Sequence, residues 1–378
     1  MKSGKENNSK IAIIIGTKAE LIKCMPIMLE LQKQKKDYWF IHTGQHNLKS
    51  ACEEFGIKRP DFILSKAPEE YNTKFWSKIN TNSITWFVKI IPKIRNLIKT
   101  LKPKYVIYHG DTMSTAVASI ASSKLLNPRK KWKNAHLEAG LRSNSIFEPF
   151  PEEISRKIAT YFSDIVFAVS KKTESFLKEN HRNKKIFNFG NTIVDSSMIA
   201  HKKSKKLKSK KKKVEDYALI NIHRHENLRS RKRLENIVKI LNQIKIKAIW
   251  PLHDNTKKYL EKYNLMDKLK KQKNIQITPL TSYKNFIALT ADCKYLITDG
   301  GSIQEESLVF KKPCILLRKR TERPEGLSTG INFLTNLNVN KTKSLIQSIE
   351  MNKIKPVKKF TNPYGKPGLS KKILGVLR

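Results

Sequence analysis

Acidic residues, cysteine and long apolar runs are all scarce in this sequence of 378 residues. The four cysteines (Cys24, Cys52, Cys293 and Cys314) are scattered and form no Cys-x-x-Cys pair, which argues against a zinc module and a disulfide framework. The first apolar stretch, Ile11 to Ile15, is too short for the core of a signal peptide or for a membrane span. We therefore expect a cytoplasmic protein that does not insert into membranes.

The scarcity of acids leaves a large positive charge, with 76 Lys and Arg against 32 Asp and Glu and a formal net charge of +44. Proteins that recognise nucleic acids tend to gather arginine and aromatic residues on one face. Here the lysines are spread along the whole chain, which favours a solvated surface over a specific nucleic-acid site. Such a charge would still attract polyanions without specificity and speed the arrival of an anionic substrate.

The densest basic run covers residues 201–213. Because like charges repel one another, this run predicts a solvated loop or helix end next to a linker. A patch that binds polyanions or a membrane surface is the alternative, and the sequence leaves it open.

The length allows two domains of ordinary size. After a charged, Asn-rich start, short apolar runs alternate with amphipathic stretches, which is typical of βαβ units, parallel sheets and helices on both faces. We expect strands at 11–15, 38–43, 105–109, 134–138 and 165–170, and then at 218–223, 248–253, 275–278, 295–299 and 314–317. Helices are expected at 19–34, 114–126, 152–161, 234–244 and 302–310. Because these strands are too many for one open sheet, the sequence predicts an α/β fold of two Rossmann-like domains.

The boundary between the two domains is expected between Asn180 and Val214, around the basic run. We predict a disordered tail at residues 1–9, an N-terminal domain at 10–182 and a C-terminal domain at 183–362. The remaining segment, 363–378, is predicted to form a helix that packs back on the N-terminal domain.

Polar side chains follow several predicted strands of the first half, at the sheet edge where doubly wound folds bind ligands. The first strand ends in Gly16-Thr17-Lys18-Ala19-Glu20, a turn that would let phosphate approach backbone N–H groups at a helix start, although Gly-Thr is common in such turns. Asp111, Glu138 and Glu152 follow later strands or open a helix, and we expect them to converge on one site. Carboxylates held together in a partly dry site suit general acid and base catalysis.

Each of these acids also has a purely structural interpretation. Asp111 could cap the helix that follows it. Glu152 and Glu153 follow Pro151 in a helix's first turn, where the helix dipole favours acids. That all three positions serve only as caps is the weaker hypothesis.

The second half carries similar strand ends, Asn221 to Asn227 and Trp250 to His253. Charged and imidazole groups packed so densely after an apolar run indicate a site. A metal site is conceivable, but no pair among His109, His136, His223, His225 and His253 has the i, i+4 spacing of helical ligands, so we predict no metal.

The most specific local pattern is Asp299-Gly300-Gly301-Ser302-Ile303-Gln304-Glu305-Glu306, where a strand ends, two glycines follow and a helix begins. This arrangement can grip a diphosphate with helix N–H groups, and a carboxylate one turn later could bind ribose hydroxyls. A capping box between Ser302 and Glu305 is the structural alternative, and both can hold at once. The charged segment from Arg318 to Gly326 is interpreted as a loop that faces the substrate.

Taken in order, these segments resemble the UDP-N-acetylglucosamine 2-epimerase family. The resemblance covers roughly residues 11 to 335 and implies a GT-B-like fold, with two Rossmann-like domains whose parallel sheets face a central cleft, paired as a homodimer. It also implies reversible conversion of UDP-GlcNAc to UDP-ManNAc without a cofactor, supplying precursors of cell-surface glycans. The matching segments are Gly16-Thr17-x-x-Glu20, Thr43–His46, His109–Thr112, His136–Arg142, Pro149–Glu153, Gly190-Asn191-Thr192-x-x-Asp195, His223-Arg224-x-Glu226-Asn227, Pro251-x-His253, Gly300-Gly301-x-x-Gln304–Glu306 and Thr321–Glu325.

The resemblance implies roles for individual residues. Its catalytic positions fall on Asp111, Glu138, Glu152 and His223. Lys23 and the Gly300-Gly301-Ser302 turn would contact the diphosphate, and Glu306 the ribose. The full set predicted to bind the UDP-sugar is Lys18, Lys23, Arg142, His253, Gly300, Gly301, Ser302, Glu306 and Arg323.

Several positions depart from the family pattern. The family usually has Gly-Thr-Arg-Pro-Glu where this chain has Lys18 and Ala19, and lysine lacks the bidentate fork that arginine offers a phosphate. The family's Ser-Gly-Gly turn is Gly300-Gly301-Ser302 here. An activating site for a second UDP-GlcNAc is not matched at Asn47-Leu48 or over Lys78–Ile84. The Glu138-Ala139-Gly140 run favours the branch that does not hydrolyse its substrate.

The hydrogen on C2 of a sugar is hardly acidic, so direct deprotonation by a carboxylate is implausible. We expect UDP to leave as the C2 proton is lost, giving a glycal to which UDP adds back after protonation on the opposite face. The alternatives are a hydrolysing epimerase that releases ManNAc, an epimerase of a modified UDP-sugar such as a 2,3-diacetamido uronate, a GT-B glycosyltransferase, and a nonenzymatic nucleic-acid binder.

Overall fold

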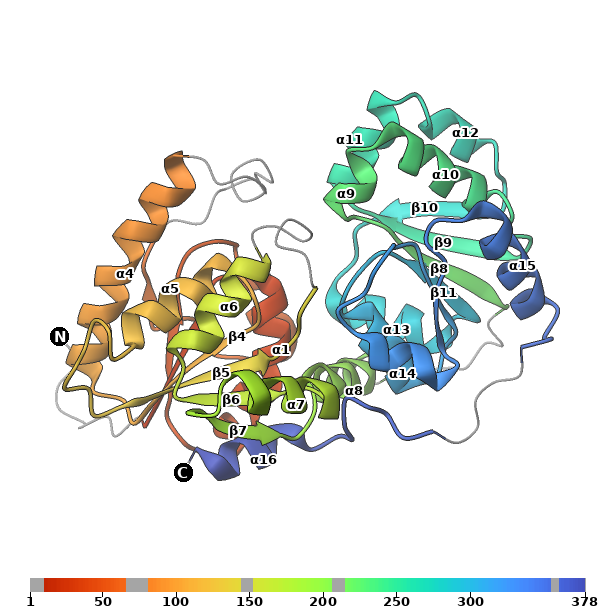
Figure 1. The fold of residues 1–378 in the computed structure, drawn as a ribbon. Helices are drawn as coiled ribbons and strands as arrows, with labels where there is room; N and C mark the ends of the chain where they lie inside the picture. Colours follow the sequence, from red (N-terminus) through yellow and green to blue (C-terminus); the bar gives the residue numbers. More distant parts are fainter. Residues whose placement is uncertain (1–9, 66–80, 144–151, 206–214, 355–359, 378) are drawn as a thin grey trace. The chain divides into compact units, whose positions relative to one another are not determined.

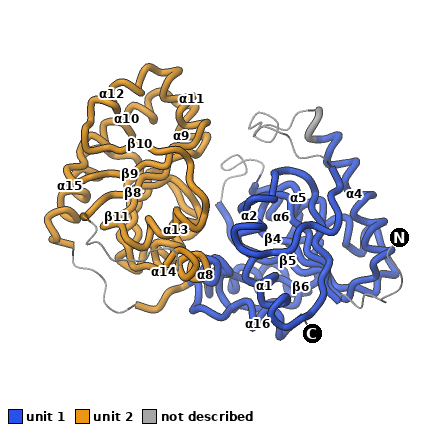
Figure 2. Tube along the Cα trace, turned by 180° about the vertical axis from the view of Figure 1, so that it is seen from behind, with its two compact units in different colours: residues 1–196, 364–378 blue, residues 197–363 orange. Residues whose placement is uncertain are grey.

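The computed structural model describes residues 10–65, 81–143, 152–205, 215–354 and 360–377. It divides into two compact units (Figures 1 and 2). The first contains residues up to Ser196 together with the segment from Tyr364 onward, and the second runs from Ser197 to Pro363.

Seven parallel strands form the sheet of the first unit, in the order β3-β2-β1-β4-β5-β6-β7. The inner strands are continuous apolar runs because both faces of the sheet are covered, and every residue of β1 and β4 is buried. The strands are β1 (Ile11–Ile15), β2 (Trp39–His42), β3 (Phe62–Ile63), β4 (Tyr105–His109), β5 (Lys133–Ala139), β6 (Ile165–Ala168) and β7 (Lys185–Asn188).

Helices flank this sheet, and the last of them comes from the far end of the chain. Helix α5 packs between α4 and α6, while α1 contacts both α2 and the C-terminal α16. The helices are α1 (Lys18–Lys33), α2 (Lys49–Phe55), α4 (Thr81–Leu101), α5 (Met113–Ser122), α6 (Glu152–Phe162), α7 (Lys171–Asn180), α8 (Ile193–Lys205), which continues into the second unit, and α16 (Leu369–Val376).

Six parallel strands form the sheet of the second unit, in the order β10-β9-β8-β11-β12-β13. Its core surrounds Trp250, which is fully buried. The strands are β8 (Tyr217–Asn221), β9 (Lys247–Leu252), β10 (Ile275–Pro279), β11 (Tyr295–Thr298), β12 (Cys314–Leu316) and β13 (Asn332–Leu334). The helices are α9 (His225–Leu228), α10 (Arg231–Leu241), α11 (Asp254–Lys262), α12 (Met266–Lys270), α13 (Tyr283–Asp292), α14 (Ile303–Phe310), the 3-10 helix η1 (Pro324–Thr329) and α15 (Val339–Glu350).

The ten predicted strands are all present, but β3, β7 and β13 were not predicted. All three are edge strands of four residues or fewer, and their side chains are mostly half-exposed, so they lack the apolar run that marks a strand in the sequence. The compact units divide between Ser196 and Ser197, whereas the sequence placed the domain boundary between residues 182 and 183. Because β7 completes the first sheet, residues 183–196 belong to the first unit.

The predicted tail at residues 1–9 and most of the basic run, residues 206–213, lie outside the described residues. Residues 201–205 end helix α8. None of the described helices combines the length and apolarity that a membrane crossing needs.

Candidate functional site

The first six strands of each unit follow the same order in their sheet, and this places polar residues at equivalent points. In each unit the first and fourth strands are neighbours in the sheet. The strands that follow the first one lie on one side of this pair, and the strands that follow the fourth lie on the other side. Doubly wound folds bind ligands at such a switch point, beyond the carboxyl ends of the strands. In the first unit, Gly16 and Asp111 follow these two strands closely, and in the second unit His223 and Asp299 do so.

The turn after β1 is closed by its own carboxylate. Glu20, only 3% exposed, accepts hydrogen bonds from the backbone N–H groups of Gly16 (2.9 Å) and Thr17 (2.7 Å). Its other oxygen accepts from Thr112 (2.6 Å) and Thr115 (2.8 Å). Burial raises the pKa of Glu20, and these hydrogen bonds oppose that rise. The N–H groups that we expected to meet a phosphate are therefore occupied.

Glu138 is the most constrained of the predicted catalytic acids. It is a non-glycine residue with φ of +61°, at the point where the β5–β6 register shifts, which is a costly conformation that surrounding contacts must hold. The Lys23 ammonium donates to both of its carboxylate oxygens, at 2.6 and 2.7 Å, and the Asn191 amide donates to one of them at 2.6 Å. This carboxylate is nearly dry, since only 3% of the side chain is exposed.

Two buried histidines lie beside Glu138 in their neutral form. Burial lowers the pKa of His109 to about 3, although Glu138 opposes this shift, and lowers the pKa of His136 to about 4. His109 Nε2 lies 4.0 Å from Glu138 and has no hydrogen bond among the described residues. His136 Nε2 is held by the carbonyl of Gly110 at 2.7 Å. The charged pair in this pocket is therefore Lys23 with Glu138.

Asp111 lies next to this cluster. A side chain built at Gly110 would approach Glu138 Oε1 to 3.9 Å, so the backbone that carries Asp111 passes close to Glu138. The carboxylate of Asp111 pairs with the buried Arg156 of α6 at 2.5 Å and is 26% exposed. Asp111 does not cap the following helix, as one interpretation had it, because Thr112 does so through Thr115 N–H.

Glu152 opens α6 one turn before Arg156, so the two side chains share one face of that helix. Since Arg156 reaches Asp111, this face is directed toward the strand ends of the first sheet. The predicted position of Glu152 and Glu153 in the first turn is confirmed, while Glu148 to Pro151 lie outside the described residues.

Three of the cations predicted to bind the substrate belong to the first unit, and two of them, Arg142 and Lys23, contact other groups of the protein. Arg142 donates to the carbonyl of Leu141 at 2.7 Å, lies 4.7 Å from the ring centre of Phe176 and is 3.8 Å from Glu153. Lys18 is exposed at the start of α1. Lys23, predicted to contact the diphosphate, is the ion-pair partner of Glu138. Their roles toward a substrate remain predictions.

In the second unit, a buried aspartate organises the turn after β8. Asp299, which is fully buried, accepts from the backbone N–H groups of His223 (3.0 Å) and Arg224 (3.1 Å) and from the Asn227 amide (2.9 Å). His223 itself is 39% exposed, and its ring centre lies 4.8 Å from that of His253. Partial desolvation by the surrounding protein lowers the pKa of His223, and burial lowers that of His253 to about 4.

The glycine turn after β11 lies against His223. A β-carbon at Gly300 would be 3.4 Å from the His223 ring, and one at Gly301 would be 3.1 Å from the buried guanidinium of Arg323. The capping box predicted between Ser302 and Glu305 is absent, because Ser302 has helical backbone angles and its side chain makes no capping hydrogen bond. The turn therefore starts α14 without the side-chain cap that closes the β1 turn.

Two buried acids follow this turn on α14. Glu306 accepts a hydrogen bond from Tyr283 at 3.0 Å. Glu305 pairs with Arg323 Nε at 2.9 Å, and both side chains are at most 4% exposed. Arg323, predicted to face the substrate, thus supports the turn from beneath Gly301.

A family description for UDP-N-acetylglucosamine 2-epimerase matches residues 29–378. The chain belongs to the UDP-N-acetylglucosamine 2-epimerase family. A relative from Methanocaldococcus jannaschii with that name is 34% identical, over 97% of this chain and 98% of its own length. One from Methanococcus maripaludis is 32% identical over 97% and 98%.

Solved structures agree with this membership. The Methanocaldococcus jannaschii enzyme in complex with UDP-GlcNAc and UDP has a TM-score of 0.78 at 33% identity, covering 97% of this chain and 99% of that one. The Neisseria meningitidis enzyme bound to UDP-GlcNAc has a TM-score of 0.80 at 27% identity, over 97% and 99%. Acinetobacter baumannii MurG, at 11% identity and a TM-score of 0.57, shows the fold alone. The predicted family and the GT-B-like α/β fold class are confirmed.

Sequence reasoning missed four polar residues that contact predicted site residues of this epimerase family member: Asn191, Arg156, Asp299 and Tyr283. Asn191 stands in a segment that matches the family, and Asp299 opens the pattern Asp299 to Glu306, but their partners lie 53 and 76 residues away. No spacing rule links such positions. Arg156 follows Glu152 by one helical turn, which was the available signal.

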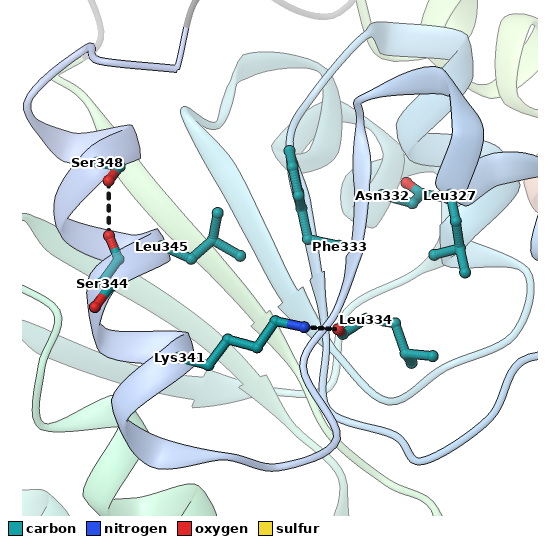
Figure 3. Close-up of a pocket in the computed structure, with 8 residues that line it drawn as sticks. All are labelled: Leu327, Asn332, Phe333, Leu334, Lys341, Ser344, Leu345 and Ser348. Carbon is teal, nitrogen blue, oxygen red and sulfur yellow. Dashed lines mark hydrogen bonds between the residues drawn. The ribbon is translucent and has the colours of Figure 1, made fainter.

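A shallow groove beside β13 and α15 lies apart from these residues (Figure 3). The Lys341 ammonium donates to the backbone carbonyl of Leu334 at 3.1 Å. The groove is lined by Leu327, Asn332, Phe333, Leu334, Lys341, Ser344, Leu345 and Ser348.

Within the described ranges, no three His, Cys, Asp or Glu side chains are grouped so that they could hold a metal ion.

Proposed function

We propose that this chain interconverts UDP-GlcNAc and UDP-ManNAc by inverting C2 of the sugar, without releasing a free sugar. Relatives that match nearly the whole chain carry the name of this activity, and two of their structures hold UDP-GlcNAc. The observation that carries the proposal is the Glu138 cluster, a buried carboxylate held by Lys23 and Asn191 beside Asp111.

The chemistry begins at the anomeric carbon. As the C1–O bond breaks, its electron pair leaves with UDP, and positive character at C1 makes the C2 proton removable. A carboxylate takes that proton, the C2–H electrons form the C1–C2 double bond, and a glycal and UDP result. Protonation of C2 on the opposite face and return of UDP to C1 give the epimer.

Two carboxylates on opposite sides of C2 would serve as base and acid. Asp111, Glu138 and Glu152 are the candidates. Glu138 suits the base, because an ammonium and an amide donor both stabilise its ionised form.

The leaving diphosphate needs stabilisation as its negative charge grows. The Gly300-Gly301-Ser302 turn, with the start of α14 and the neighbouring His223, is the proposed binding element. Glu306 would bind the ribose, with its carboxylate oriented by Tyr283.

The experiment is to follow the purified chain by ¹H NMR, starting once from UDP-GlcNAc and once from UDP-ManNAc. We expect both reactions to reach the same mixture of the two UDP-sugars. Accumulation of free ManNAc would instead identify a hydrolysing epimerase, and no change without an added acceptor would indicate a glycosyltransferase.

A second candidate substrate has a specific observation in its favour. A Pseudomonas aeruginosa UDP-2,3-diacetamido-2,3-dideoxy-D-glucuronate 2-epimerase is 30% identical over 86% of this chain and 88% of its own length. The exposed Lys18, where the family usually has arginine, could bind an extra carboxylate as readily as a phosphate. Specificity constants for a panel of UDP-sugars separate the two substrates.

We also propose that the enzyme acts as a homodimer in the cytoplasm, without binding a particular nucleic acid. Light scattering after gel filtration gives the assembly. Binding to DNA that is independent of sequence and disappears with added salt is expected from the charge alone.

A further inference from the structure

We propose that the C-terminal segment, residues 364–377, positions the Glu138 carboxylate by way of Asn191. The inference rests on the proposed function, because it assigns Glu138 a part in the chemistry. Residues 364–377 are far in sequence from every predicted site residue, yet in this proposal they hold the Glu138 carboxylate in place.

The segment docks on the loop that carries Asn191. The backbone N–H of Asn191 donates to the Tyr364 carbonyl at 2.9 Å, and Tyr364 is fully buried. A β-carbon at Gly190 would lie 2.1 Å from that same carbonyl oxygen, and φ of +105° also demands glycine there. The loop and the segment therefore fit each other at backbone distance.

A carboxylate fixes the next part of the segment. Asp195, only 5% exposed, accepts from the backbone N–H of Gly368 at 2.6 Å and of Ser370 at 2.8 Å. These groups lie at the start of α16, where N–H groups lack partners within the helix. Asp195 thus joins α16 to the first turn of α8, two residues after Ile193.

The orientation of the Asn191 amide is set on both sides. Its Oδ1 accepts from the backbone N–H of Ile193 at 3.1 Å, so its Nδ2 must point the other way, where it donates to Glu138 Oε2 at 2.6 Å. Asn191 is 1% exposed and has little room to turn. One residue thus holds the C-terminal segment with its backbone and Glu138 with its side chain.

The second support of Glu138 also adjoins the segment. Lys23 belongs to α1, the helix against which α16 packs. Among the described residues, the charged and titratable groups that act on Glu138 include Lys23 and Cys24 from α1 and His109 from β4, with Asp111 and His136 near them. Since φ of Glu138 is strained, loss of these supports would let the carboxylate move.

The test measures the pKa of Glu138 by ¹³C NMR of its carboxyl carbon, assigned with Glu138→Gln, together with the pH profile of kcat. Asn191→Asp keeps the acceptor for Ile193 N–H but replaces the donor by a second acid. We expect the two acids to share a proton, so that the Glu138 titration and the acid limb of kcat both move up by about one pH unit or more. Because the lost amide donor no longer positions the carboxylate, kcat at its pH optimum should also fall at least about tenfold, with KM within about twofold.

Asp195→Asn loosens the docked segment without touching Glu138. It should shift both readouts in the same direction and lower kcat by about 2- to 10-fold, the effect of weakening one or two hydrogen bonds. Lys371→Ala, an exposed change on the same helix, is the matched control and should equal the wild type.

An Asn191→Asp chain with an unshifted Glu138 titration, or an Asp195→Asn chain indistinguishable from Lys371→Ala, would overturn the inference. If the wild type is inert on every UDP-sugar, the proposed function fails, and the carboxyl titrations still decide whether the segment positions Glu138.

Discussion

The two units share a strand order but differ in how they treat the turns at their switch points. In the first unit, Glu20 accepts hydrogen bonds from the N–H groups of the turn after β1. The nearby Lys23 and Glu138 form a buried ion pair. In the second unit, the turn after β11 has two glycines; Thr298 accepts from the Gly300 N–H at 2.9 Å, but Ser302 makes no capping hydrogen bond at the start of α14. The same topology therefore supports a cluster of acids in one unit and a candidate anion-binding turn in the other.

This contrast predicts that chemistry and nucleotide binding can be removed separately. Glu138→Gln or Asp111→Asn should lower turnover by about 10²-fold or more, because each removes a candidate proton acceptor or donor. Calorimetric titration should find UDP affinity close to that of the wild type. Near-normal rates in both variants would remove these acids from the mechanism.

The reciprocal change lies in the glycine turn. Gly301→Val would meet the Arg323 guanidinium, which lies 3.1 Å from the β-carbon position, and would keep phosphate away from the backbone. We expect the Kd for UDP to rise about tenfold or more, the loss of one or more hydrogen bonds to a charged group. The titration of Glu138 should stay unchanged. Unchanged UDP affinity would mean that the turn does not bind the diphosphate.

Acid should act on the first unit through its buried histidines. The pKa of His136 is about 4 in the folded chain and near 6.5 when unfolded, so below pH 6.5 the unfolded chain binds the extra proton. The free energy of unfolding should therefore fall as pH drops from 6.5 toward 4, by up to about 1.4 kcal/mol per pH unit for this residue. His136→Gln should flatten that slope in denaturant titrations; an equal slope would contradict the buried neutral state.

The smallest expected effect compares the two turns directly. Thr17 accepts from Glu20 N–H as a helix cap, whereas Ser302 makes no such bond. Thr17→Ala should cost about 1 kcal/mol of unfolding free energy. Ser302→Ala should stay within about 0.5 kcal/mol. Equal losses in the two variants would show that Ser302 does cap its helix in solution.

The sequence was most informative where packing dictates composition. β1 and β4 are buried on both faces, so their apolar runs mark their ends correctly. β7 carries Lys185 and Asn188 in four residues, and as an edge strand it needs no apolar run. Because this strand was not predicted, the domain boundary was placed after residue 182, fourteen residues before the compact units divide at Ser196.

The sequence predicted which residue types stand at which strand ends of the candidate site, but not which side chains contact one another there. The acids at Asp111 and Glu138 stand where a doubly wound sheet gathers polar groups. The Lys23–Glu138 pair joins residues 115 apart, and the positive φ of Glu138 arises from a local register shift that no periodicity reveals. The contact of Asn191 with Tyr364 depends on the chain returning to the first unit at its end.

Incubation of the wild type with UDP-GlcNAc in D2O, followed by NMR at C2 of the product, shows whether C2 exchanges its hydrogen with solvent during the reaction. Elimination and return of UDP require the C2 proton to be lost and a solvent proton to be gained. We therefore expect UDP-ManNAc with deuterium at C2. UDP-ManNAc that forms with its original hydrogen at C2 would contradict it.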